Sequence, residues 1–272
     1  MQRSARSEIV PLPLTPSRAP ADAVVRRDGR FFLSDQDNAD DDLELTPPTA
    51  ERVAARSLVL ALTSCRGFID ADAADASDFW QRVRDWFTTL DINSELEPFE
   101  RELIDQPLGT LSPQVRVNLA WACEGMAVLA WALSRLAMPP YDQSIVAADV
   151  AESIGFLKSR PETVLESPSL QSVEHILEAR EQLFAINWRL TEYRLQSRPI
   201  EFPTVAQNAW FGPMSLGACR IVDGDLAIGD VRIDKADPAR LREAVSIATE
   251  RHRAANWLVG ESQVYSEIDT ST

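Results

Sequence analysis

Polar side chains interrupt the apolar faces of three predicted helices, and these residues are the ones best placed to carry chemistry. In the helix expected over residues 238–259, a histidine sits in the middle of an apolar stripe of 3.6-residue spacing. In the helix expected over 170–195, an arginine and an asparagine break the stripe. In the helix expected over 113–136, one acid stands in an almost wholly apolar run. The candidate polar cluster consists of Glu124, Arg180, Asn187, His252, Arg253 and Asn256.

A charge on such a face costs on the order of several kcal/mol unless it is paired and hydrogen-bonded. We therefore predict that Glu124 pairs with Arg180 or Arg253, and that His252 or Asn256 completes the network. Two interpretations stay open. In the structural one, a buried salt bridge fixes how three helices pack. In the functional one, Glu124 or His252 acts as a base in a small pocket where Arg180 or Arg253 binds an anion.

An aromatic pair, Trp210-Phe211, falls in a loop rich in Gly and Pro, where it is either a binding anchor or a lid over the neighbouring strands. Known catalytic motifs are absent: there is no G-x-S-x-G, no phosphate-binding loop and no H-E-x-x-H. His175 lies about 100° around its helix from the acidic face that begins at Glu174. We expect no metal site and no cofactor.

The elements that position these residues are mainly helices. Thr46-Pro47-Pro48 predicts the start of a helix that runs to about Phe68, with Thr46 as its cap. Ser94-Glu95-Leu96-Glu97 reads as a capping box that opens a shorter helix ending at Asp105. Further helices are expected over residues 74–90, 113–136, 144–157, 170–195 and 238–259.

A change of pattern separates the last two helices. Residues 219–222 and 225–228 flank Asp223-Gly224, which predicts a hairpin, and residues 231–233 form a possible third strand. The fold class is therefore mainly α: a multi-helix globular domain with a small antiparallel β-meander near residues 219–233. Helices and strands do not alternate as they would in a parallel sheet.

Residues 1–45 differ from the rest, because prolines break any helix and a mildly basic stretch precedes an acidic one. We expect a flexible or partly docked N-terminal tail over 1–45, in which Phe31-Phe32-Leu33 forms a short strand or a docking anchor. Residues 46–272 are expected to form a single mainly helical domain.

The amino-acid composition limits the kinds of partner that we expect the chain to bind. The 272 residues include 42 acids against 27 Lys and Arg, a formal charge of −15, which disfavours nucleic acid. Three separated cysteines argue against disulfides and suit a reducing cytoplasm. The apolar N-terminal run is too short and proline-broken for a signal peptide. Residues 119–138 contain Glu124 and Arg135, so we expect a buried core helix there and no membrane partner.

Scattered segments resemble one family. Residues 250–258 (ERHRAANWL) and 267–270 (EIDT) are similar to the closing signature of the bacterial domain of unknown function 4272 family. Trp121 to Leu133, Arg56-Ser57-Leu58 and Trp188 also fit. Where members tend to carry Trp-Asp before the last acids, this chain has Tyr265-Ser266, which removes one carboxylate. The resemblance implies a cytosolic, helical bacterial protein and implies no activity.

Two functions from different classes follow. The first is a non-catalytic protein-interaction module that uses its acidic surface on a basic protein, as an immunity-type protein or a regulator would. The second is an enzyme of unrecognised type with a polar pocket around Glu124, Arg180, His252 and Asn256. An open polar pocket favours the enzyme, whereas a closed ion pair favours the interaction module. The sequence leaves the oligomeric state unknown.

Overall fold

The computed structural model describes residues 23–25, 31–33, 46–69 and 71–272. Two short strands, β1 (Ala23–Val25) and β2 (Phe31–Leu33), pair antiparallel, with Ala23 opposite Leu33. β2 covers the segment in which the sequence predicts a strand or an anchor. The remainder of the predicted tail lies outside the described residues, so its flexibility and its docking stay predictions.

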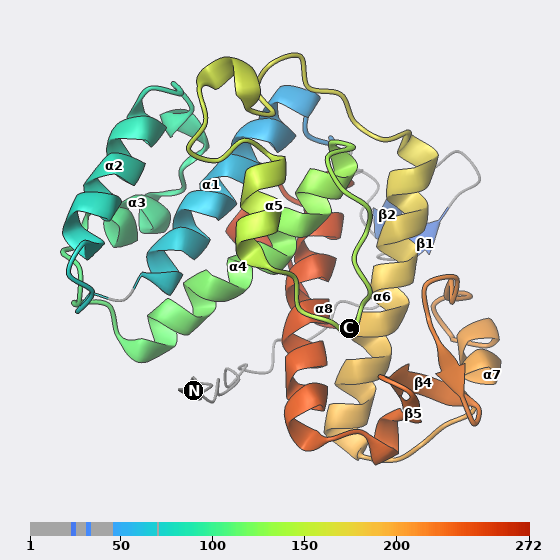
Figure 1. Ribbon diagram of the computed structural model, residues 1–272. Helices are drawn as coiled ribbons and strands as arrows, with labels where there is room; N and C mark the ends of the chain where they lie inside the picture. The colour runs from blue at the N-terminus through green and yellow to red at the C-terminus, as the bar shows by residue number, and fades with distance from the viewer. Residues whose placement is uncertain (1–22, 26–30, 34–45, 70) are drawn as a thin grey trace.

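The predicted mainly α fold is confirmed (Figure 1). Single 3₁₀ turns occur at Asn93–Glu95, Arg160–Glu162, Ile233–Lys235 and Tyr265–Glu267. The α-helices of the described residues are α1 (Ala50–Phe68), α2 (Ala76–Thr88), α3 (Pro98–Asp105), α4 (Pro113–Ala132), α5 (Ala147–Ser153), α6 (Val173–Gln196), α7 (Phe202–Gln207) and α8 (Pro238–Leu258).

The β-meander also forms where the sequence predicts it. β3 (Ile221–Val222), β4 (Asp225–Ile228) and β5 (Val231–Arg232) are paired antiparallel in that order. The Asp223-Gly224 turn between β3 and β4 has positive φ at both residues, 48° and 79°. Such φ values suit a two-residue hairpin turn, and glycine adopts them at no steric cost.

Side-chain caps fix the starts of the long helices. The Ser112 hydroxyl accepts the Val115 N–H at α4, and the Ser172 hydroxyl accepts the His175 N–H at α6. Asp237 accepts two backbone N–H groups at the start of α8. Each cap satisfies helix N–H groups that have no partner within the helix. The predicted starts of α4 and α8 are thereby confirmed.

Other predicted boundaries are wrong. The cap of α1 is Thr49, not Thr46, since its hydroxyl accepts the Arg52 N–H at 3.3 Å. The capping box of α3 joins Glu97 and Glu100, because Pro98 is the first helical residue and the residues before it form a 3₁₀ turn. The sequence pattern also missed α7, whose six residues are too few for a helical period to be seen.

The buried α1 helix organises the core. Every side chain from Val53 to Ser64 is buried, and α1 packs along α4. α8 packs against α4 on one side and against α6 on the other. One apolar cluster contains residues of α1 through α5, of the first half of α6 and of the end of α8. A second contains residues of the second half of α6, α7, the meander and the start of α8. α8 therefore connects both clusters.

α4 occupies the segment in which the sequence predicts a buried core helix. Its residues from Met126 to Ala130 are fully buried, and Glu124 on the same helix is buried too. In the described part of the chain we find no helix with the length and apolarity needed to cross a bilayer. The apolar run thus serves the packing between α1 and α8.

A buried ion pair attaches the meander to the helices. Arg189 on α6 donates to both carboxylate oxygens of Asp225 on β4, at 2.6 Å each, and both side chains are fully buried. Arg189 also donates to the Arg198 carbonyl, and Asp225 accepts the Ile200 N–H. One charge pair thus holds the end of α6, the connection to α7 and the sheet together.

The crossing of α1 and α4 gives a first prediction. A Cβ at Gly67 would lie 2.6 Å from the Ala120 nitrogen and 2.7 Å from the Arg116 carbonyl oxygen, both backbone atoms. We expect Gly67→Ala to lower the free energy of unfolding, because overpacking costs about 1–3 kcal/mol while the gain in helix propensity is at most about 1 kcal/mol. Urea denaturation measures the difference.

Gly217→Ala is the matched control, since its Cβ would meet only the flexible end of the Gln182 side chain. It should leave stability close to that of the wild type. Equal stability of the Gly67→Ala chain would contradict the close helix crossing.

Candidate functional site

Glu124 is buried and paired, but its partner is Arg251. Arg251 donates two hydrogen bonds to one Glu124 oxygen, at 2.8 and 3.0 Å, and each side chain is only 1% exposed. The predicted pairing with Arg180 or Arg253 is wrong. Arg180 belongs to α6, which α8 separates from α4. Arg253 lies two residues from Arg251 on α8, so it points to another side of the helix, where it pairs with Glu250.

The Glu124–Arg251 pair also organises the loop between α4 and α5. Arg251 donates to the carbonyls of Pro139, Pro140 and Gln143, and Glu124 accepts the Ile145 N–H. Burial raises the pKa of Glu124, and the Arg251 charge and these hydrogen bonds oppose the rise. The pair is a closed structural unit that fixes a loop, with no face open to a ligand.

Arg180, Asn256 and Glu261 form a second group. Arg180 donates to Asn256 Oδ1 at 3.2 Å and pairs with Glu261 at 2.8 Å and Glu181 at 2.7 Å. Its guanidinium also lies over the ring of Phe184. Glu261 follows the end of α8. This group therefore ties α6 and α8 to the segment that comes after them.

His252 and Asn187 form a third group, which touches the same segment further on. The Asn187 amide nitrogen lies 3.3 Å from His252 Nδ1 and 3.1 Å from the Thr270 carbonyl oxygen. Because Asn187 donates to Nδ1, the neutral ring carries its proton on Nε2. Nε2 is buried and has no hydrogen-bond partner among the described residues. Burial lowers the pKa of His252 to about 3, and the Arg180 charge adds to the shift.

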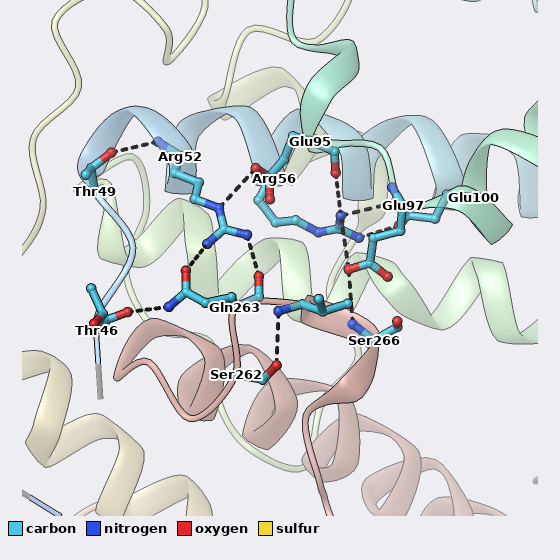
Figure 2. A network of polar contacts seen from close by, with 11 residues as sticks. Thr46, Thr49, Arg52, Arg56, Glu95, Glu97, Glu100, Ser262, Gln263 and Ser266 are labelled. Atoms are coloured by element: carbon cyan, nitrogen blue, oxygen red, sulfur yellow. Dashed lines mark hydrogen bonds and ion pairs between the residues drawn. The ribbon is translucent and has the colours of Figure 1, made fainter. Parts of the chain in front are cut away.

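A fourth group was missed from the sequence. Arg56 in the middle of α1 pairs through both terminal nitrogens with Glu100 and lies 3.6 Å from Glu97 (Figure 2). It donates to the Glu95 carbonyl as well, and its guanidinium lies 4.7 Å from the ring centroid of Tyr265. An arginine in the apolar run from Val53 to Leu62 is the signal that would have revealed the group, by the reasoning applied to Glu124.

Residues 261–270, which we call the strap, meet three of these groups. After α8 the chain passes the start of α1, where Arg52 donates to the backbone carbonyl and the side chain of Gln263 (Figure 2). It continues past Glu97, which accepts the Ser266 N–H at 3.1 Å. It then returns along α8, where the Asn256 side chain donates to the Asp269 carbonyl. The strap therefore lies in a seat built by α1, the start of α3, α6 and α8.

Tyr265 is one of two buried residues of the strap, the other being Ile268. Its ring packs edge-on against Trp257, with centroids 5.8 Å apart. Its hydroxyl lies against α4 where Gly125 leaves room, since a Cβ at Gly125 would collide with it. Burial, and after it the Glu250 charge, raises the pKa of Tyr265. The hydroxyl has no hydrogen-bond partner in the part of the chain that the structure describes.

Trp210 and Phe211, the aromatic pair, have different environments. Phe211 packs edge-on against Phe184, with centroids 5.6 Å apart, and lies 6.4 Å from Trp188. Trp210 contacts Phe211 but is 76% exposed. Phe211 therefore attaches the loop to α6, and Trp210 is presented to solvent.

The predicted cluster does not form an open pocket. A cavity of about 440 Å³ lies between the 138–143 loop, α6 and residues 218–220, and none of the six predicted polar residues lines it. Arg251 shapes one wall, because it holds the carbonyls of Pro139 and Pro140. Of the six, Glu124 faces the loop, and Arg180, Asn187 and Asn256 face the strap.

Comparison with known proteins decides the family. Residues 38–207, more than half of the chain, match the family described as Domain of unknown function (DUF4272). The chain belongs to this family. The match confirms the resemblance and includes Arg56, Glu124 and Arg180, whereas residues 250–270 lie beyond it. No curated protein and no solved structure matches the chain.

The closed pair in this DUF4272 member gives a second prediction. Glu124→Gln should lower the free energy of unfolding by about 3–5 kcal/mol, because the Arg251 guanidinium keeps its charge in the interior without a carboxylate. Glu250→Gln is the control: Arg253 is 28% exposed, so its loss should be at most about 1 kcal/mol. Chemical denaturation compares the two, and equal losses would contradict the assigned role of Glu124.

The neutral His252 gives a third prediction. The pKa of its folded form, about 3, is below the unfolded value of 6.5, so its contribution is complete above pH 6.5 and is lost as pH falls toward 3. Over this range the wild type should lose up to about 1.4 kcal/mol per pH unit relative to His252→Gln. Denaturation at a series of pH values measures the slope. The exposed His175→Gln variant should follow the wild type, and a His252→Gln slope equal to that of the wild type would refute the assignment.

Proposed function

We propose that this DUF4272 member is a non-catalytic, cytoplasmic protein-interaction module that binds a basic protein, with Trp210 as its anchor. The observation that carries the proposal is the exposure of Trp210 on a loop whose next residue is fixed to α6. Tryptophan is enriched among the residues that dominate binding energy at protein interfaces.

The loop is held in place before any partner binds. Phe211 is packed on α6, the Gly212 N–H donates to the Ala209 carbonyl, and the Met214 N–H donates to the Ala206 carbonyl. A side chain presented by a fixed loop loses little conformational entropy on binding. This preorganisation supports an anchor more than a loop that closes on the meander.

The charge of the chain supports a basic partner. A formal charge of −15 raises the rate at which a cationic protein is encountered and makes the association sensitive to salt. An immunity-type protein that neutralises a basic toxin, or a regulator of a basic protein, would bind in this way.

The closure of the polar cluster supports a non-catalytic role. A general base must come within hydrogen-bond distance of its substrate. Glu124, His252 and Asn256 are at most 3% exposed, and their contacts are to the protein's own chain. This arrangement gives the alternative enzyme little support.

Affinity capture tests the proposal. The tagged chain is used to capture proteins from a lysate of its own host at low and high salt, and mass spectrometry quantifies what is retained. We expect one stoichiometric basic partner that is lost at high salt. Trp210→Ala should reduce its recovery at low salt by about tenfold or more, since truncation of such an anchor costs about 2 kcal/mol or more.

Leu195→Ala is the matched control, because Leu195 is 71% exposed at the end of α6 and has no assigned role. Its capture should equal that of the wild type. Absence of a partner at either salt concentration, or equal recovery by the Trp210→Ala chain, would overturn the proposal.

A further inference from the structure

The polar residues that neither catalysis nor the Trp210 loop explains converge on the strap. From four separate elements, they contact it along almost its whole length, and they approach chiefly its backbone. Arg52 and Asn187 donate to strap carbonyls, and Glu97 accepts a strap N–H. The seat residues are Arg52, Arg56, Glu97, Arg180, Asn187 and Asn256, and His252 lies behind Asn187.

This mode of contact is that of a peptide-binding groove. Hydrogen bonds to backbone atoms hold an extended chain whatever its side chains are, and pockets for a few side chains supply selectivity. Here Tyr265 and Ile268 are buried, whereas Ser266, Glu267 and Asp269 between and beyond them are exposed. At the entry of the strap, the Glu261 carboxylate pairs with Arg180.

In the described part of the chain, partnerless buried polar atoms gather at the seat and the strap. The large majority of buried polar atoms in folded proteins are hydrogen-bonded. Several polar side-chain atoms of the strap and of the residues beside it nevertheless lack a partner among the described residues. These atoms are Glu97 Oε2, His252 Nε2, Arg253 Nε, Trp257 Nε1 and Tyr265 Oη.

Both features are explained if the seat is at times uncovered. Charged and amide side chains are then solvated when the strap is away, and the strap does not have to satisfy every one of them. The strap begins where α8 ends: Gly260, between them, has a φ of +88°, the left-handed conformation in which helices commonly terminate at glycine.

We propose that the seat is a peptide-binding site that the strap occupies in cis, and that an extended segment of another protein can take its place. The ligand carries a carboxylate, an aromatic residue four positions later and an aliphatic residue three positions after that, the pattern of Glu261, Tyr265 and Ile268. The unpaired polar atoms of the seat supply the hydrogen bonds by which such a segment binds more tightly than the strap. This site is separate from the Trp210 loop and does not depend on its role.

A peptide in trans tests the proposal on the full-length chain. The probe is a fluorescein-labelled peptide with the sequence of residues 261–272, and binding is followed by fluorescence anisotropy. Tyr265→Ala loosens the strap and leaves the seat intact, because Tyr265 belongs to the strap. We expect the Tyr265→Ala chain to bind the peptide at least about tenfold more tightly than the wild type, the factor for the loss of one buried aromatic side chain.

Two controls make the result specific. A peptide with alanine in place of the residues equivalent to Tyr265 and Ile268 should bind neither chain. The Trp210→Ala chain should bind the peptide as the wild type does, which separates this site from the proposed interaction surface. A Tyr265→Ala chain that keeps its helical circular dichroism but does not bind the peptide, or binds both peptides alike, overturns the proposal.

Hydrogen exchange on the wild type provides a second test that needs no variant. The proposal expects the Ser266 and Ile268 amides to exchange through a local opening, at least about tenfold faster than the amides in the middle of α8. Strap amides that exchange only at the rate of global unfolding would show a permanent part of the core, and the proposal would fail.

Discussion

The fold depends on the requirement that a buried guanidinium has a partner for its charge and for its N–H groups. Arg56, Arg189 and Arg251 are among the largest fully buried side chains of the described residues. Each meets a buried carboxylate and also donates to backbone carbonyls from another part of the chain. Because arginine offers five donors in a fixed plane, one side chain can fix several segments at once.

This constraint explains how loops are positioned in a protein with so little sheet. The loop between α4 and α5 has no ladder of backbone hydrogen bonds, yet Arg251 binds three of its carbonyls. Arg189 and Asp225 do the same for the connection from α6 to the meander. Burial of two charges contributes little net stability in such pairs, but loss of one partner leaves the other uncompensated. The pairs thus select one arrangement of the loops above the alternatives.

Sequence patterns predicted what local physics determines. The starts of α4 and α8, which Ser112 and Asp237 cap, and the turn at Asp223-Gly224 depend on a few adjacent residues, and they form where expected. The pairing of Glu124 could not be predicted, because it depends on the order in which helices pack. α8 lies between α4 and α6, and a step of one residue turns a helical side chain by about 100°. The partner of Glu124 is therefore Arg251 and not Arg253, which points to another side of α8.

The fourth polar group was missed for a different reason. Arg56 lies in an apolar helix just as Glu124 does, but its partners come from a short 3₁₀ turn and from the cap and first turn of α3, segments too short for a periodic signal. The role of the polar residues in holding the strap was equally hidden. Asn187 and Asn256 donate to backbone carbonyls of residues 269–270. Since every residue has a backbone carbonyl, such contacts cannot be recognised from residue types.

The contacts between the seat and the strap also determine how tightly another chain would have to bind in order to displace the strap. The strap is covalently joined to α8, and a segment tethered over a short distance has an effective concentration on the order of millimolar. A free peptide that makes only the same contacts therefore displaces little of it. A competing segment must gain hydrogen bonds that the strap does not make, and Glu97 Oε2, on the carboxylate that accepts the Ser266 N–H, has no partner among the described residues. Imperfect pairing in cis is thus what allows the seat to discriminate in favour of a ligand in trans.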